Sequence, residues 1–166
     1  YTVTAAVTTG DALYTTAVTA AVSVSNTDDD TKGIIVTPTT GLTTTEAAGG
    51  SATFTVVLAS QPTADVTIGV TSSKTTEGTV SAAALTFTAA NWNTAQTVTV
   101  TGADEAVDDG DQSYSIVTAA ASSSDLTYNG VDADDVSVTN TDNDTKGITV
   151  TPTTGLTTTE AAGGSA

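Results

Sequence analysis

The side chains with the clearest capacity for chemistry are carboxylates, and they gather in two short stretches. Residues 104–111 read Asp-Glu-Ala-Val-Asp-Asp-Gly-Asp, whereas residues 78–103 contain no acid. A second group reads Thr-Asp-Asn-Asp over residues 141–144 and is matched by Thr-Asp-Asp-Asp over residues 27–30. Clustered carboxylates repel one another unless a cation neutralises them. Ca²⁺ is the natural candidate, because it takes roughly six to eight oxygen ligands and needs no nitrogen or sulfur.

Isolated acids extend this candidate site. Glu46 lies in an expected turn, and Glu77 lies beside Gly78. The alternative interpretation is a solvated acidic surface that keeps a secreted protein soluble, and Asp and Asn are also ordinary turn residues. Confinement of the acids to two loops and a boundary favours the cation site, because solubility alone would scatter the charge. The solvated interpretation is kept for four further acids, Asp125, Asp132, Asp134 and Asp135.

Composition excludes several classes of function. The chain has no Cys or His, and its three cationic residues stand against 19 acids, for a net charge of −16. Such a charge repels nucleic acid and anionic membranes. Without His and with few Lys, a Ser or Thr hydroxyl lacks a conventional activating base, and no phosphate-binding loop is present. No apolar run approaches the roughly 18–20 residues of a membrane span. We therefore expect no enzyme, no nucleic-acid partner and no membrane span in this sequence.

The sequence repeats itself. Residues 31–52 recur at residues 145–166, 114 positions later, and the two stretches differ only at Ile35 and Thr149. A period of 114 residues matches an independently folding domain rather than a solenoid unit. We therefore predict the C-terminal part of one repeat over residues 1–30, a complete repeat over 31–144 and the N-terminal part of a third over 145–166. Near-identical tandem copies usually provide reach, stiffness or multivalent contact.

Alternation of apolar and polar residues with a period of two runs through the complete repeat. This pattern, with turn residues between the segments and no helical stripe, predicts seven or so short strands in an antiparallel β-sandwich with Greek-key connections. Trp92, the only tryptophan, is interpreted as a core plug or edge cover, with carbohydrate stacking as the alternative. The expected core is Phe54, Val56, Leu58, Val66, Ile68, Val70, Leu85, Phe87, Val98, Val100, Tyr114, Ile116, Val136 and Val138, with Ile34 and Val36 alternating in the first strand.

Three stretches resemble the Calx-beta family, the immunoglobulin-like modules of sodium/calcium exchangers, integrin β4 and large bacterial surface proteins. They are residues 45–56, residues 98–114 and residues 136–144, which resemble the family's entry into its second strand, its acidic loop and its terminal acidic triplet. The resemblance covers the whole 114-residue unit. It implies an immunoglobulin-like sandwich that binds Ca²⁺ at one end through Glu46, Asp104, Asp108, Asp111, Asp142 and Asp144.

Some positions depart from the family pattern. Ala103 replaces the first of the paired aspartates in the acidic loop, and Asn143 replaces the middle acid of the triplet. Glu77 is a possible substitute for an acid of a stretch that is not recognisable here. Asp28 and Asp30 are the corresponding positions in the preceding repeat. With fewer carboxylates, we expect one or two ions per repeat.

Two non-enzymatic functions remain open. The first is a structural repeat module of an extracellular filament or adhesin stalk at the cell surface, stiffened by Ca²⁺ near the repeat boundaries. Its partners would be adjacent repeats of the same chain and other copies in a fibre. The second is an adhesive or carbohydrate-binding module of a surface protein. The sequence favours the first, because near-identical copies would all bind the same ligand and aromatic platforms are scarce.

Overall fold

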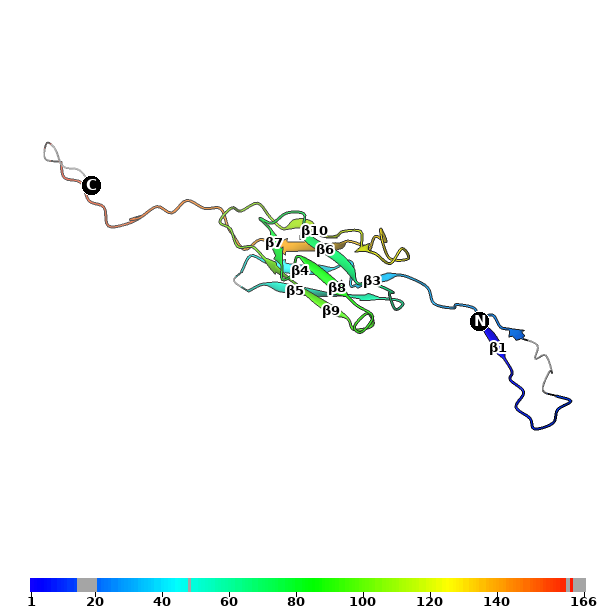
Figure 1. The fold of residues 1–166 in the computed structure, drawn as a ribbon. Coiled ribbons are helices and arrows are strands. Elements are labelled where there is room, and N and C mark those ends of the chain that lie inside the picture. The colour runs from blue at the N-terminus through cyan, green and yellow to red at the C-terminus, as the bar shows by residue number, and fades with distance from the viewer. Residues whose placement is uncertain (15–20, 48, 161, 163–166) are drawn as a thin grey trace. The chain divides into compact units, whose positions relative to one another are not determined.

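The computed structural model describes residues 1–14, 21–47, 49–160 and 162, and it divides into two compact units, Tyr1–Thr31 and Lys32–Ala166. All regular structure in these residues is β-strand, and none of them forms a helix that could cross a membrane. The first unit contains a single hairpin, β1 (Thr2–Thr4) with β2 (Ala21–Ser23). The second unit contains the β-sandwich (Figure 1).

Two sheets form the sandwich. The four-stranded sheet has the order β3 (Ile34–Thr37), β5 (Ser51–Leu58), β9 (Gln96–Gly102), β7 (Gly78–Val80). The six-stranded sheet has the order β11 (Ser122–Ser123), β6 (Val66–Ser72), β10 (Gln112–Thr118), β12 (Val136–Thr141), β4 (Leu42–Thr45), with β8 (Ala84–Phe87) paired to β6. Figure 1 shows the sheet containing β5 and β9 below the sheet containing β6 and β10.

The chain changes sheets between β3 and β4. β3 pairs antiparallel with β5, whereas β4 pairs in parallel with β12, so that Leu42 lies opposite Val138 and Thr45 opposite Thr141. This pairing corrects the sequence prediction in two respects. The sandwich is not wholly antiparallel, and β4 is a strand where the sequence indicated only a turn. Gly41, with a φ of 79°, provides the left-handed residue at which the chain bends into β4.

The buried residues confirm the core that the alternation pattern predicted. All fourteen residues expected in the core are at most 6% exposed, because each inward position of a strand faces the opposite sheet. Leu42, Ala121 and Tyr128 complete the core, and Trp92 packs against it as a half-buried cover, which agrees with its interpretation as a structural residue. Ile34 and Val36 are half-buried because β3 is an edge strand.

A tyrosine closes the end of the sandwich at which β3 begins. The Tyr128 hydroxyl donates to the Ser60 carbonyl at 2.7 Å and accepts from the Ser60 amide at 3.0 Å. Nearby, the Asp125 carboxylate accepts from the Thr63 amide at 2.7 Å and from the amide and hydroxyl of Thr127 at 2.8 and 2.6 Å. The solvated interpretation of Asp125 is therefore wrong, since its side chain is 5% exposed and orders two loops. Asp132, Asp134 and Asp135 are exposed.

Two segments of the chain lie outside the sandwich, one before it and one after it in the sequence. Tyr1 exchanges two backbone hydrogen bonds with Val24, which extends the hairpin of β1 and β2. Beyond Asp144, three apolar side chains stay outside the sandwich: Ile148, Val150 and Leu156 are 95%, 66% and 61% exposed. The division into repeats at residues 30 and 144 stays a prediction.

Candidate metal centre

The acidic residues that the sequence separates meet at the end of the sandwich where β4, β9 and β12 finish. Glu46 follows β4, the acidic loop of residues 103–111 follows β9, and Asp142 follows β12. The parallel pairing of β4 with β12 brings Glu46 beside the last residues of β12, where its amide donates to the Thr141 carbonyl at 3.1 Å. Backbone pairing therefore fixes the position of Glu46.

Two carboxylate triads share Glu46. In one, Glu46, Glu105 and Asp109 offer oxygens that all lie within 4.8 Å of one another. In the other, Glu46, Asp142 and Asp144 do the same. The Glu46 side chain is 1% exposed. A buried carboxylate between two groups of acids has the position of a ligand that bridges two cations.

Unsatisfied oxygens give an independent test of whether a cation fits. Four buried side-chain oxygens in the described residues have no hydrogen-bond partner: Glu46 Oε1, Glu77 Oε2, Glu105 Oε1 and Asp144 Oδ2. Three of them belong to the triads. Because buried polar atoms in folded proteins are nearly always paired, these orphaned oxygens are candidate ligands for a cation. An all-oxygen donor set of this kind suits Ca²⁺ or another hard cation.

The electrostatics of the cluster agree with this interpretation. Burial raises the pKa of Glu46, and the nearby charges of Asp142 and Glu105 add to the rise. Burial also raises the pKa of Glu105, with further contributions from Asp109 and Glu77. The pKa of Asp142, by contrast, is lowered, because its carboxylate accepts hydrogen bonds from the backbone amides of Asp144 and Gly110. A cation would offset the repulsion that adds to the effect of burial on the pKa values of Glu46 and Glu105.

A buried hydrogen-bond network forms the floor of the site. The Thr44 hydroxyl donates to Asn140 Oδ1 at 2.9 Å and lies 3.2 Å from the Tyr114 hydroxyl. Asn140 Nδ2 then donates to the Ala103 carbonyl at 3.1 Å. The network joins β4, β10 and β12 to the first residue of the acidic loop. It therefore holds the three chain segments that carry the triads at fixed distances from one another.

Glu77 approaches the site from the turn between β6 and β7. Its side chain is 3% exposed, and one of its oxygens forms an ion pair with Lys74 Nζ at 3.1 Å while the other is unpartnered. Its carbonyl accepts from the Ala103 amide at 3.0 Å. Glu77 belongs to neither triad, but its charge contributes to the raised pKa of Glu105.

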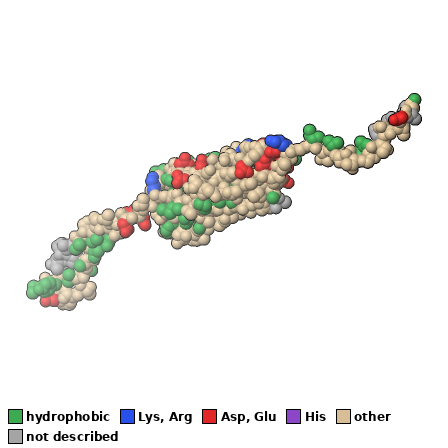
Figure 2. All heavy atoms as spheres, turned by 180° about the vertical axis from the view of Figure 1, so that it is seen from behind, with side chains coloured by type: hydrophobic (Ala, Val, Ile, Leu, Met, Phe, Trp, Pro, Cys, Tyr) green, Lys and Arg blue, Asp and Glu red, His purple; other side chains and the backbone are tan. Residues whose placement is uncertain are grey.

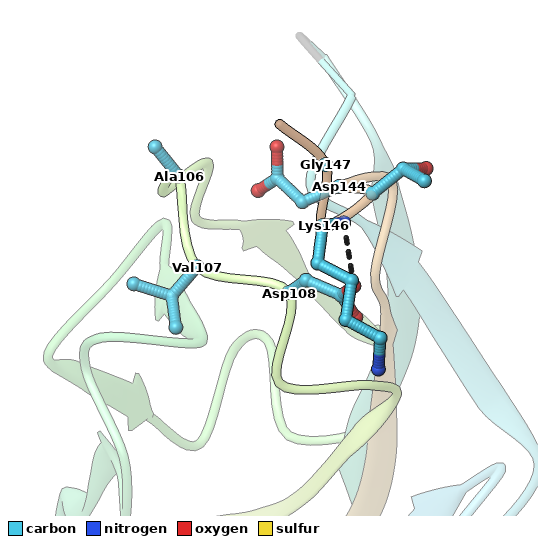
Figure 3. Close-up of a pocket in the computed structure, with 7 residues that line it drawn as sticks. Ala106, Val107, Asp108, Asp144, Lys146 and Gly147 are labelled. Atoms are coloured by element: carbon cyan, nitrogen blue, oxygen red, sulfur yellow. Dashed lines mark hydrogen bonds between the residues drawn. The ribbon is translucent and has the colours of Figure 1, made fainter. Parts of the chain in front are cut away.

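Asp108 and Asp111, both predicted as ligands, hold the backbone of the exit segment, residues 142–147. Asp111 Oδ1 accepts from the Asp142 amide at 3.1 Å, and Asp108 Oδ2 accepts from the Lys146 amide at 2.7 Å (Figure 3). The Asp142 carboxylate in turn accepts from the Gly110 amide at 2.7 Å. Glu46 Oε2 accepts from the Asn143 amide at 3.3 Å. These bonds tie the exit segment to the acidic loop.

The remaining predicted positions lie outside both triads. Asp104 is exposed and belongs to neither of them. Asp28 and Asp30 lie in the other unit of the chain, where Asp28 Oδ1 accepts from the Asp30 amide at 3.1 Å. Glu105 and Asp109 were not among the predicted ligands, although both lie in the acidic loop. Their adjacency to selected aspartates was the only signal, because loop residues have no periodicity from which to read orientation.

These observations define an immunoglobulin-like β-sandwich with a carboxylate cluster at one end. No protein-family model and no curated protein matches the chain. Among solved structures, the periplasmic chaperone SfaE matches with a TM-score of 0.51 and 8% identity over 66% of this chain. The chain spans 57% of the length of SfaE. This likeness establishes a shared fold.

The similar solved structures also include a domain of the family that the sequence resembles. The apo form of the Calx CBD1 domain has a TM-score of 0.49 and 16% identity, and the match covers 68% of this chain and 96% of that domain. Domains 4 and 5 of the S-layer protein SbsC have a TM-score of 0.42 and 26% identity, over 75% of this chain and 52% of theirs.

Proposed function

We propose that this chain is a structural, non-enzymatic module of an extracellular filament or adhesin stalk, in which Ca²⁺ binds the Glu46-centred cluster and stiffens the boundary between repeats. The observation that carries the proposal is the unpartnered Glu46 Oε1, buried where the two triads meet. Asp142 and Asp144 belong to one triad and also begin the exit segment. An ion held there would bind the sandwich and its exit segment together.

The sequence repeat and the charge distribution support the role in a surface filament. The net charge of −16 favours the cation-rich exterior over nucleic acid or anionic membranes as surroundings. The recurrence of residues 31–52 at 145–166 makes adjacent copies of the module the first partners to expect. In such an array, one cation cluster per copy would act at every boundary.

The first prediction concerns Ca²⁺ and thermal stability. A ligand that binds only the folded state stabilises it by about 2.7 kcal/mol at 100 times its Kd, which is roughly 10 °C in melting temperature for a domain of this size. The melting temperature of the 166-residue chain should therefore rise on replacing chelator with Ca²⁺, as followed by circular dichroism. Asp144→Asn should remove most of the rise, since it takes away a triad ligand.

Asp104→Asn is the matched control, because it deletes the same charge from the same end of the sandwich outside both triads. It should keep the Ca²⁺-dependent rise. Identical melting curves in Ca²⁺ and in chelator for the unsubstituted chain would overturn the metal site. Equal losses in Asp144→Asn and Asp104→Asn would reduce the effect to general charge screening.

A further inference from the structure

A cavity of about 480 Å³ lies between the acidic loop and the exit segment, next to the candidate metal centre. Figure 3 shows Ala106, Val107 and Asp108 on the loop side and Lys146 and Gly147 on the other. Val107 is apolar and 58% exposed, within a loop that is otherwise mostly acidic. Together with Ala106, it makes part of the loop side of the cavity apolar.

The direction in which the chain leaves this cavity is fixed. Asp108 holds the Lys146 amide at 2.7 Å, and Asp142 Oδ1 holds the Asp144 amide at 2.7 Å. With the bonds from Glu46 and Asp111 described above, the backbone amides of residues 142, 143, 144 and 146 are each held by a carboxylate. Residues 145–147 therefore leave the sandwich along a defined path rather than as a free linker.

The internal repeat identifies the surroundings of Gly147 in an array. Residues 145–147 copy Thr31-Lys32-Gly33. In the complete sandwich, the Gly33 carbonyl accepts from the Ala59 amide at 2.9 Å, and a Cβ built on Gly33 would lie 3.4 Å from Ala59 Cβ. The turn between β5 and β6, which begins at Ala59, is thus a direct neighbour of this glycine. In a following copy, the same turn would lie one hydrogen bond from Gly147, which itself lines the cavity.

The turn is suited to dock as a rigid piece. Ser60 is held by three contacts of the Tyr128 hydroxyl, at 2.7, 2.9 and 3.0 Å, and Pro62 is buried. Ala59 itself is exposed and uncharged. A rigid turn that presents Ala59 to Ala106 and Val107 loses little conformational entropy on contact. Its one acidic residue, Asp65, lies at the end of the turn that adjoins β6.

We propose that the cavity beside Val107 is the docking site for the β5–β6 turn of the following copy of this module, with the second copy's Ala59 against Val107. This inference rests on the proposed tandem filament and adds to it a direct contact between consecutive sandwiches. The junction between copies is then a two-part joint, made of the carboxylate-anchored exit segment and an apolar contact beside it.

Site-directed disulfides test this contact, because the chain has no Cys. The protein to use is the full chain continued after residue 166 by a further run of residues 53–144, which gives two complete copies. Val107→Cys in the first copy is paired with Ala59→Cys in the second. The control pair combines Val107→Cys with Leu126→Cys in the second copy. Leu126 is 86% exposed and lies two residues before Tyr128.

Docking predicts that the Ala59 pair oxidises at least about tenfold faster than the control pair, because an undocked tether gives both pairs similar effective concentrations. Moving the first thiol to Ala106 and adding Val107→Lys should bring the two rates together. Melting curves of the reduced proteins check that every variant folds. Equal rates for the two pairs, or a faster control pair, overturn the docking.

The two proposals can fail separately. Preferential oxidation of the Ala59 pair in chelator and in Ca²⁺, with no Ca²⁺-dependent melting shift, supports the docking and rejects the metal site. A melting shift without preferential oxidation supports the metal site and rejects the docking.

Discussion

Glu46 shows how a single residue can carry the chemistry of a site that many residues surround. Its carboxylate is the one group common to both triads, and burial raises its pKa. A buried charge without a partner destabilises a fold, whereas the same charge beside a cation becomes a ligand. Glu46 is therefore expected to oppose folding in chelator and to support it in Ca²⁺.

Glu46→Gln tests this double role. The substitution keeps the shape and removes the charge, so the chain in chelator should melt several degrees higher at about pH 7, because repulsion with Asp142 and Glu105 is lost. In the same protein the Ca²⁺-dependent rise should be largely absent. Thermal melts with and without Ca²⁺ measure both effects. A Gln variant that is less stable in chelator and still responds fully to Ca²⁺ would contradict the assignment.

The dependence of stability on pH arises from the same residues. The raised pKa values of Glu46 and Glu105 mean that the folded chain binds their protons more tightly than the unfolded chain, from their ordinary value of 4.5 upward. Stability in chelator should thus fall as pH rises through that window. The lowered pKa values of Asp125 and Asp142 act in the opposite sense, and their contribution is lost as pH falls below 3.8.

The expected result is a maximum of stability in chelator at mildly acidic pH, at about pH 5, which Glu46→Gln should flatten on its alkaline side. Melting temperatures in chelator across a pH series give the curve. A stability that rises steadily from pH 5 to pH 7 in the unsubstituted chain would show that the repulsion in the cluster is not significant.

At the scale of elements, alternation identified the strands that face the core on one side. β5, β6, β9, β10 and β12 each carry at least two buried apolar residues at alternate positions, and such a pattern is readable without a structure. β4 was missed because its sequence, Leu-Thr-Thr-Thr, offers one apolar side chain. Its pairing with β12 lies about a hundred residues away along the chain, and no local pattern reveals such a partner.

The candidate site, like the strands, could be predicted only in part. Its location at two loops and a boundary could be predicted, because charge density is a property of sequence. The membership of the triads could not, since it depends on how residues 103–111 fold back over β4 and β12. Asp104 and Asp109 are equally acidic and five positions apart, yet only Asp109 reaches Glu46.

A glycine in β7 makes possible the packing beneath the candidate metal centre. A Cβ built on Gly78 would overlap the Tyr114 hydroxyl, so Gly78→Ala should force that ring out of the buried network and destabilise the chain by about 1–3 kcal/mol. Gly69→Ala in β6 is the matched control, because its Cβ would meet Ala119 at an ordinary 3.4 Å. Denaturant unfolding of both variants measures the difference. Equal stabilities would show that Tyr114 relaxes without loss.

The opposite end of the sandwich depends on the Tyr128 hydroxyl. Tyr128→Phe leaves the buried amide and carbonyl of Ser60 without that partner, and the expected loss is about 1–3 kcal/mol. Because the hydrogen bonds between Tyr128 and Ser60 lie at the far end of the sandwich from the Glu46 cluster, the Ca²⁺-dependent rise in melting temperature should be unchanged. Chemical unfolding in chelator and in Ca²⁺ separates the two quantities. A loss of the Ca²⁺ response would mean that the two ends are coupled.

At the scale of the whole molecule, charge and secondary structure are separated. None of the twelve strands in the described residues carries a charged side chain, so every carboxylate lies in a loop, a turn or a segment outside the sandwich. Figure 2 shows the result: broad tan and green surfaces on the sandwich, with red side chains toward its margins. Thr and Ser cover the outward faces of the sheets.

Because the carboxylates are concentrated in the loops, we expect added salt to raise the melting temperature of the calcium-free chain. Raising NaCl from about 0.05 to about 0.5 M shortens the screening length to well under 10 Å and should raise the melting temperature in chelator. The rise should be much smaller in Ca²⁺, because the ion already neutralises the cluster. Melts at four combinations of salt and Ca²⁺ provide the comparison, and equal salt effects in both conditions would place the repulsion elsewhere.

The parallel pairing of β4 with β12 has a mechanical consequence. When an array is pulled, a sandwich is loaded through the start of β3 and the end of β12, so the segment that includes β4 is drawn one way and its partner the other. Since Leu42 to Thr45 run alongside Val138 to Thr141 in the same direction, their hydrogen bonds lie across the applied force and must break together in shear. An antiparallel pair loaded at one end would instead unzip bond by bond. In the proposed array, β4 would therefore set how much tension a module withstands before it unfolds.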